Sequence, residues 1–277
     1  MDEKFIILTT TGILGDAIKN IVKGDAHVAV VSLMGPGIDP HMYQTTQKDV
    51  QQFRRARIIF YNGLDLEDKM KDLLAKERKA YAVSDALNKT ALLCDGPVGI
   101  DPHIWFDVSI WKQVVGFISQ KLQAARPESA AYYQSNTVAY MEVLEQLHQS
   151  VTTQIQSIPE KQRVLITAHD AFGYFGKAYG IEVVGLQGIS TVSECGLKDI
   201  QHIVALIIQR NVKAVFFETS VSDKSMRAVL EGCAHYGHKV AVGGALYSDA
   251  LGSPNTLAGT YCGMVRANAT TIVNALK

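Results

Sequence analysis

Short apolar segments alternate with amphipathic segments through most of the chain. In the first part, the apolar runs FIILT (5–9), AHVAVVSLM (26–34) and RIIFYN (57–62) are separated by stretches whose apolar residues recur every three or four positions. The alternation returns with RVLITA (163–168) and continues to the end of the chain. Apolar strands joined by amphipathic helices are typical of parallel sheets covered by helices. The pattern predicts an α/β fold of two lobes, each with a mostly parallel β-sheet flanked by helices.

A different pattern lies between the two lobes, from Pro127 to Pro159. This segment has no other Pro and no Gly, and proline suits both the first position of a helix and the point where a helix stops. Its apolar residues follow one helical stripe in steps of three and four: Val138, Met141, Leu144, Leu147, Val151, Ile155 and Ile158. The segment is either an ordinary long helix packed on one domain or a rigid strut between two lobes. We favour the strut, with lobes at 1–126 and 160–277 and the linking helix at 127–159.

Composition and charge narrow the possible functions. The 277 residues are 47% hydrophobic, enough for one large core or two moderate ones. The 27 basic and 27 acidic residues form no run of like charge, which argues against a nucleic-acid surface and against a polybasic membrane patch. No stretch approaches the roughly 20 apolar residues of a membrane span. The first residues lack the features of a signal peptide, so we expect an exported form to have lost its signal.

The four cysteines do not identify the compartment. Cys94, Cys195, Cys233 and Cys262 are widely spaced and form no C-x-x-C pair. The simplest interpretation is that these cysteines are ordinary small hydrophobic side chains. A disulfide between two of them stays open, because sequence does not give connectivity.

The pentapeptide GIDPH occurs twice, at Gly37–His41 and at Gly99–His103. Its proline fixes its own φ and keeps the preceding Asp out of the helical region, so the His leaves the turn in few directions. Such ordering suits a metal ligand, since less entropy is lost on binding. Imidazole is a ligand for Zn, Mn, Fe, Ni and Cu.

Two further polar residues follow predicted strands. His169 comes directly after RVLITA, and Asp249 lies in the loop GGALYSDALG (243–252). Loops at the carboxyl edge of parallel strands are where open α/β sheets bind ligands. With His41 and His103, these residues form a candidate four-ligand site for one divalent transition metal ion. Each histidine alone is equally explained as a solvated loop residue, and the compact spacings H-E-x-x-H and C-x-x-C are absent.

Other chemistries have less support. The chain lacks the G-x-G-x-x-G and Walker A motifs of nucleotide-binding proteins and the G-x-S-x-G motif of serine hydrolases. Glu218, at the end of VKAVFFE, has three interpretations: a general base, a partner that orients a metal-binding imidazole, or a helix-start residue. The first keeps a metal-dependent hydrolase open as the alternative function.

Several segments resemble the landmarks of a known family, in order and in spacing. They are MGPGIDPHMY, NGLDLE, GIDPHIWFD, LITAHDAFGYFGKAYGIEVVGLQGIS, VFFETS and GGALYSDALG. The family is that of the cluster A-I (TroA- and ZnuA-like) substrate-binding proteins of ABC transporters that import zinc and manganese, and the TroA branch is the most similar. The resemblance covers essentially the whole chain. It implies two α/β lobes bridged by one long helix, and a non-enzymatic protein that delivers Zn²⁺ or Mn²⁺ to a permease and its ATPase.

Carried over by residue, the family's metal ligands fall on His41, His103, His169 and Asp249. Manganese-selective relatives tend to have Glu in place of His169, whereas zinc-type relatives often carry a long His- and acid-rich loop that is missing here, so the metal is Zn²⁺ or Mn²⁺. The lipoprotein cysteine of many members is also missing. We therefore expect this chain to be a mature or truncated form of a periplasmic or extracytoplasmic protein, and lipid anchoring of the full-length precursor stays open. We also expect a monomer without a nucleic-acid partner.

The mechanism of capture and release also has expected parts. Asn62 and Glu218 are candidates to orient the imidazoles. The long helix should resist wide hinge motion, so we expect the loop at 243–252 to move and Asp249 to be the ligand most able to leave. Protonation of the imidazoles should weaken metal binding below roughly pH 6.5.

Overall fold

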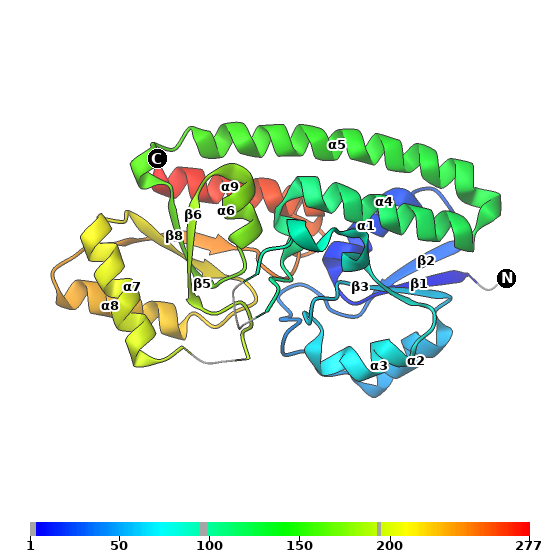
Figure 1. Cartoon of the computed structure of the whole chain (residues 1–277), viewed down its shortest axis with the longest axis horizontal. Helices are drawn as coiled ribbons and strands as arrows, with labels where there is room; N and C mark the ends of the chain where they lie inside the picture. The colour runs from blue at the N-terminus through cyan, green and yellow to red at the C-terminus, as the bar shows by residue number, and fades with distance from the viewer. Residues whose placement is uncertain (1–3, 95–98, 193–194) are drawn as a thin grey trace.

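The computed structural model describes residues 4–94, 99–192 and 195–277. Two α/β lobes lie side by side, and one long helix runs along both of them (Figure 1). Both lobes have parallel strands covered by helices, so the predicted fold class is confirmed. Within the described ranges, no helix has the length and apolar character needed to cross a membrane. Within these ranges, Cys195, Cys233 and Cys262 form no disulfide.

The N-terminal lobe has a four-stranded sheet in the order β2-β1-β3-β4. The strands are β1 (Phe5–Thr9), β2 (Val28–Ser32), β3 (Ile58–Tyr61) and β4 (Ala80–Ala82), and every pairing is parallel. The helices are α1 (Gly12–Ile21), α2 (Gln47–Arg55), α3 (Lys71–Lys76) and α4 (Val108–Ala125). In β1, Ile7 packs into one core cluster, while Ile6 and Leu8 pack into another on the opposite face. The continuous apolar run FIILT therefore reflects a strand that is covered on both faces.

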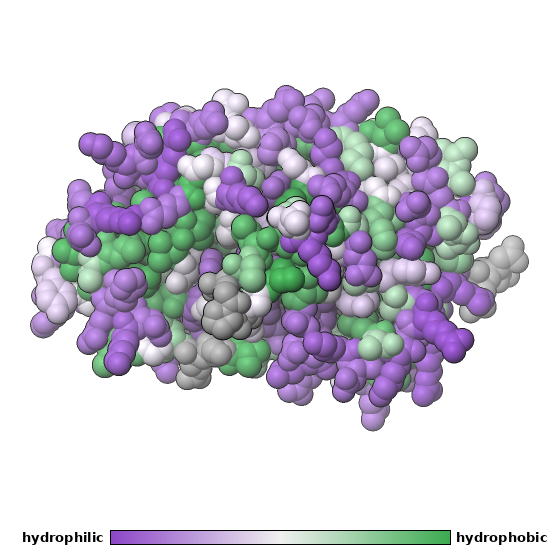
Figure 2. Space-filling model, viewed as in Figure 1, coloured by the Kyte–Doolittle hydropathy of each residue, from purple (hydrophilic) through white to green (hydrophobic). Residues whose placement is uncertain are grey.

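The C-terminal lobe is built from two parallel strand pairs. β5 (Val164–His169) pairs with β6 (Glu182–Gln187), β7 (Ala214–Glu218) pairs with β8 (Ala241–Leu246), and β5 lies beside β7. The helices are α6 (Gly173–Tyr179), α7 (Leu197–Arg210), α8 (Lys224–His235) and α9 (Tyr261–Leu276). On the face in Figure 2, hydrophilic side chains spread over both lobes, and hydrophobic residues gather over α7 and α8. Leu197 and Tyr236 are exposed there, beside an apolar groove between the two helices.

The linking helix, α5 (Ala130–Gln156), follows a 3-10 turn at Pro127–Ser129. It packs on α1 and α4 of the first lobe and on α6 and α9 of the second, as expected of a strut. The division of the chain at 126 and 159 stays a prediction. One part of the predicted stripe is wrong, because Val138 is 50% exposed.

The buried face of the first half of α5 uses residues that a count of apolar positions overlooks. These are Tyr133, Thr137 and Tyr140, which continue in steps of three and four to Leu144 and Leu147. Two of these side chains have partners for their hydroxyl groups inside the protein: Tyr133 Oη donates to Asp25 Oδ2 (2.6 Å), and Thr137 Oγ1 donates to the Tyr133 carbonyl (2.7 Å). A satisfied hydroxyl lets an amphipathic side chain occupy a buried position.

The contrast between buried and exposed positions on α5 gives a prediction about the free energy of unfolding. Leu147→Ala should lower the free energy of unfolding by about 2–5 kcal/mol, because Leu147 is fully buried and its loss leaves a cavity. Val138→Ala should stay within about 0.5 kcal/mol of the wild type. Urea unfolding of the metal-free protein, followed by circular dichroism, measures both changes. Equal losses in the two variants would contradict the observed packing of the helix.

Candidate metal centre

The candidate ligands lie where strands end at the boundary between the lobes. His169 is the last residue of β5, and Asp249 follows β8 within a few residues. His41 lies in the loop after β2, and His103 lies just before a 3-10 turn and the start of α4. The Asp107 carboxylate caps α4 by accepting the backbone N–H of Ser109 (2.8 Å), which defines where this second loop ends.

The two GIDPH copies form the same local turn. Asp39 Oδ1 accepts the backbone N–H of His41, and Asp101 Oδ1 accepts that of His103, each at 2.9 Å. The glycine that opens each copy has a positive φ, 71° in the first and 113° in the second. This repeated Asx turn, stiffened by proline, explains why one pentapeptide serves twice: each copy presents one imidazole.

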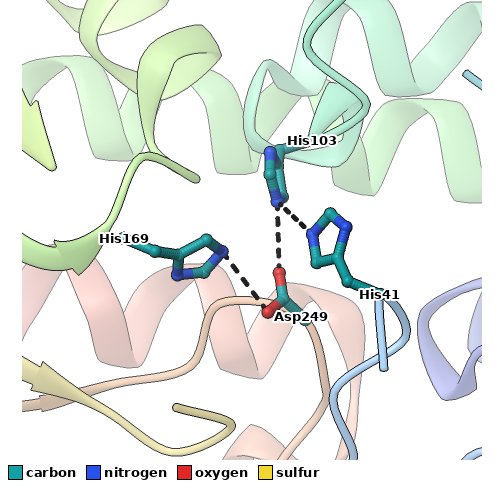
Figure 3. Close-up of side chains that lie close together, drawn as sticks. All are labelled: His41, His103, His169 and Asp249. Carbon is teal, nitrogen blue, oxygen red and sulfur yellow. Dashed lines mark hydrogen bonds and ion pairs between the residues drawn. The ribbon is translucent and has the colours of Figure 1, made fainter. Parts of the chain in front are cut away.

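The structure brings the four predicted side chains together (Figure 3). His41 Nε2 lies 3.3 Å from His103 Nε2. The two carboxylate oxygens of Asp249 lie 3.4 Å from His103 Nε2 and 3.5 Å from His169 Nε2. One donor atom from each residue lies within 4.8 Å of the other three, and no side chain is more than 2% exposed.

The spacing and the unsatisfied atoms of this cluster fit a bound cation. A tetrahedral ion with bonds of about 2.0–2.1 Å places its donors about 3.3–3.4 Å apart, close to the observed distances. His169 Nε2 and Asp249 Oδ1 are buried and make no hydrogen bond within the described part of the chain. Buried polar atoms normally have partners, and an ion between these two atoms would supply one. The cluster is consistent with one divalent metal ion.

Glu218 orients His169, as one interpretation of the sequence predicts. Its Oε1 accepts the backbone N–H of His169 (2.8 Å), and its Oε2 lies 2.5 Å from His169 Nδ1. A carboxylate on Nδ1 keeps the hydrogen there, so the lone pair of Nε2 is free to face the ion. Both carboxylate oxygens of Glu218 therefore contact His169.

His103 has a carboxylate partner that the sequence reasoning did not single out. Asp101 Oδ1, besides accepting the backbone N–H, lies 2.8 Å from His103 Nδ1. The only signal was the motif itself, which places an Asp two residues before each His. In the first copy the same position behaves differently, because Asp39 makes no contact with an imidazole among the described residues. Its Oδ2 instead accepts the Thr191 hydroxyl (2.6 Å).

Asn62 positions a loop and not a ring. Its Nδ2 donates to the carbonyls of Pro102 (2.9 Å) and Gly63 (3.1 Å), and it contacts no imidazole among the described residues. Asn62 is held in turn by Glu67, a buried carboxylate that the sequence reasoning missed. Glu67 accepts the backbone N–H groups of Asn62 (2.7 Å) and Gly63 (3.1 Å) and the Thr10 hydroxyl (2.7 Å). This network supports the backbone immediately before His103.

The Asp249 loop is also held from both lobes. Ser220 Oγ donates to Asp249 Oδ2 (3.1 Å), and it lies 2.8 Å from Ser248 Oγ. From the N-terminal lobe, Trp105 Nε1 donates to the Ser248 carbonyl (3.0 Å). The site is therefore surrounded by hydrogen bonds that order its donors in advance.

Comparison with known proteins matches residues 7–275 to one family model, described as ZnuA, the periplasmic component A of a zinc-uptake complex. The chain belongs to this family. It is 45% identical over 283 residues to the manganese-binding lipoprotein MntA of Bacillus subtilis, covering 100% of this chain and 91% of that protein. It is 43% identical to the zinc-binding protein TroA of Treponema pallidum, over 99% and 90% of the two chains. The solved structure of TroA superposes with a TM-score of 0.95 over 99% of each chain.

Membership of the ZnuA family also bears on catalysis. The family and the relatives named above are substrate-binding components of transporters and not enzymes. The expectation that the chain is not an enzyme is confirmed by this membership.

In the metal-free site, charge is distributed unevenly over the four residues. Burial alone would lower the pKa of His103, but the Asp101 hydrogen bond and charge, together with Asp249, raise it to about 9. Burial likewise opposes the charged form of His169, yet Glu218 and Asp249 raise its pKa well above the usual value. Burial and the charge of His103 lower the pKa of His41 to about 3.

Asp249 balances the two cationic rings. Burial would raise its pKa, but the charge of His169 and the hydrogen bond from His103 hold that pKa well below the usual range. With no metal bound, these shifts favour the protonated forms of His103 and His169, the neutral form of His41 and the ionised form of Asp249. Protons occupy the place that an ion would take.

The Asp101 contact can be tested by an isosteric change. In metal-free Asp101→Asn, the pKa of His103 should fall below about 9, because the ring loses its nearest negative charge while the Asx turn is kept. A raised pKa stabilises the fold below the unfolded value of about 6.5, and this contribution is lost as the pH rises through about 9. The wild type should therefore lose stability relative to the variant over that interval. NMR titration of the ring and urea unfolding at both ends of the interval measure the two effects.

Asp39→Asn is the matched control for this experiment. It makes the same change at the same position of the other turn, where the carboxylate does not contact a ring. His103 should titrate in this variant as it does in the wild type. An equal fall of the His103 pKa in both variants would show that the Asp101 contact is not the cause.

Proposed function

We propose that this protein is an extracytoplasmic solute-binding protein that captures one divalent transition metal ion between its lobes and delivers it to an ABC permease. The ligands are His41 and His103 from the first lobe and His169 and Asp249 from the second. The observation that carries this proposal is their buried convergence on one point. The names of relatives support it, since several are substrate-binding lipoproteins of metal ABC transporters. The partners are a membrane permease and its ATPase, and the chain works as a monomer without nucleic acid.

The arrangement favours capture over catalysis. Four protein donors fill a tetrahedral ion, whereas catalytic zinc sites keep one position open for water or substrate. The general base of a hydrolase would have been Glu218, but both of its oxygens are engaged by His169. The hydrolase alternative therefore has no free base and no open coordination position.

Zn²⁺ and Mn²⁺ both fit the donor set. Three imidazoles and one carboxylate suit Zn²⁺, which the TroA relative is named for. Both oxygens of Asp249 face the site, so the carboxylate is able to supply one donor or two. A second oxygen suits Mn²⁺, which prefers oxygen ligands and which the MntA relative is named for.

Metal binding itself is the first test. Titration calorimetry should show one Zn²⁺ or Mn²⁺ bound per chain. His41→Ala should lower the affinity by more than the roughly 10–100-fold that the loss of an outer partner costs, because one of four direct donors is lost. His41 is neutral in the metal-free site, so its removal strands no charge. His202→Ala, on the exposed surface of α7, is the control and should bind as the wild type does. Unchanged affinity in His41→Ala would refute the proposed ligand set.

Proton release is a second consequence of the site's electrostatics. Ligation requires neutral imidazoles, while His103 keeps its proton up to about pH 9 and the pKa of His169 is also raised. At neutral pH each ion should therefore displace at least one proton, and affinity should fall as the pH drops from about 9. Affinity should therefore begin to fall at a higher pH than the roughly 6.5 expected from unperturbed histidines. Calorimetry in two weakly metal-binding buffers of different ionisation enthalpy counts the protons. Asp101→Asn should release fewer, and an equal count would contradict the explanation.

A further inference from the structure

The first GIDPH turn is bonded to the opposite lobe through its Asp. Asp39 Oδ1 holds the backbone of His41, and Asp39 Oδ2 accepts the Thr191 hydroxyl at 2.6 Å. Thr191 follows β6 in the C-terminal lobe, so this hydrogen bond joins residues 152 positions apart. One carboxylate thus contacts both the turn that presents a candidate ligand and the lobe that supplies two others.

A second contact brings the same turn against the C-terminal lobe. Gly37 lies so close to the end of β7 that a Cβ at this position would be 3.5 Å from the Thr219 carbonyl oxygen. The turn therefore approaches the other lobe at two points, Gly37 and Asp39, and the Asp39–Thr191 bond is a polar contact between the turn and that lobe.

The Asp39–Thr191 bond lies at the solvent side of the site. Asp39 and Thr191 are both half-buried, whereas the four candidate ligands are at most 2% exposed. Other hydrogen bonds between the lobes lie deeper: Trp105 donates to the Ser248 carbonyl, and Tyr261 donates to the Trp105 carbonyl (2.7 Å), with both aromatic rings fully buried. These two contacts are shielded from water, whereas the half-buried Asp39–Thr191 bond is open to replacement by water.

We infer that Thr191 is a positioning residue that latches the His41 turn onto the C-terminal lobe and so slows the release of the bound ion. The inference rests on the proposed function. The bond forms only when the lobes are at the separation that brings His41 to the donors of the other lobe. It must break before the turn moves away with its imidazole. A hydroxyl donating to a carboxylate is a charge-assisted bond, stronger than one between neutral groups.

The latch predicts a change in release and little change in capture. Thr191→Val keeps the shape of the side chain and removes the hydroxyl. Release of Zn²⁺ to a chromophoric chelator in stopped flow should become about tenfold faster, while the association rate changes little. Thr191→Ser keeps the hydroxyl and should release Zn²⁺ within about twofold of the wild type. The Co²⁺ absorption spectrum of Thr191→Val should match that of the wild type, because the four candidate ligands are unchanged.

Thr153→Val is the matched control. Thr153 is exposed on α5, and its hydroxyl bonds only to the Gln149 carbonyl of its own helix (3.0 Å). Its release rate should equal that of the wild type. A wild-type rate in Thr191→Val, or equally fast release from Thr191→Ser, would overturn the latch while leaving the proposed function intact. A wild-type protein that binds no Zn²⁺ would overturn both.

Discussion

The structure depends on one buried carboxylate that faces two imidazoles from different lobes. Asp249 meets His103 of the first lobe and His169 of the second, and none of the three is exposed to water. Charges so deeply buried persist only when they compensate one another. The raised pKa values of His103 and His169 favour protonated rings beside this carboxylate when no metal is bound, and a bound ion would take the place of those protons. The union of the lobes and the affinity for an ion therefore have the same physical origin. A site that favours bound protons at neutral pH also has a built-in limit on how tightly it binds metal.

The three imidazoles are not equivalent, and the difference lies in their supports. His103 and His169 each have a carboxylate on Nδ1, which fixes the tautomer and makes the ring a better donor. His41 has no such carboxylate among the described residues, and burial keeps it neutral. It needs no deprotonation before it binds. In the turn that carries His41, Asp39 contacts Thr191 of the other lobe instead of an imidazole. The Asp of the motif therefore contacts the imidazole of its own turn in the second copy and a residue of the other lobe in the first copy.

Local features made much of this predictable. Neighbouring residues alone reveal the apolar runs, the segment without Pro or Gly, and the proline-stiffened turns before two histidines. The fold class and the clustering of the four side chains could therefore be predicted from the sequence. What sequence could not give depends on distant partners. Tyr133 and Thr137 join the buried face of α5 only because their hydroxyl groups find acceptors. The roles of Asp101, Glu67 and Thr191 are likewise set by which loop lies opposite. No spacing rule reveals those neighbours, and Asn62 was assigned to a ring although it holds a carbonyl.

The packing around the ligand loops also bears on which of them moves. The glycines near Asp249 suggested a mobile loop, but a Cβ on Gly243 would lie 2.5 Å from the Phe216 ring, so this glycine serves close packing. Tyr247, two residues before Asp249, exchanges two hydrogen bonds with the Asn268 side chain, at 2.9 and 2.7 Å. By contrast, the first GIDPH turn contains the exposed side chain of Ile38 and is followed by that of Met42. Because α5 packs on elements of both lobes, a wide hinge motion would disturb that packing. A local change would be easier, and the His41 turn, with its exposed side chains, is better placed for it than the Asp249 loop.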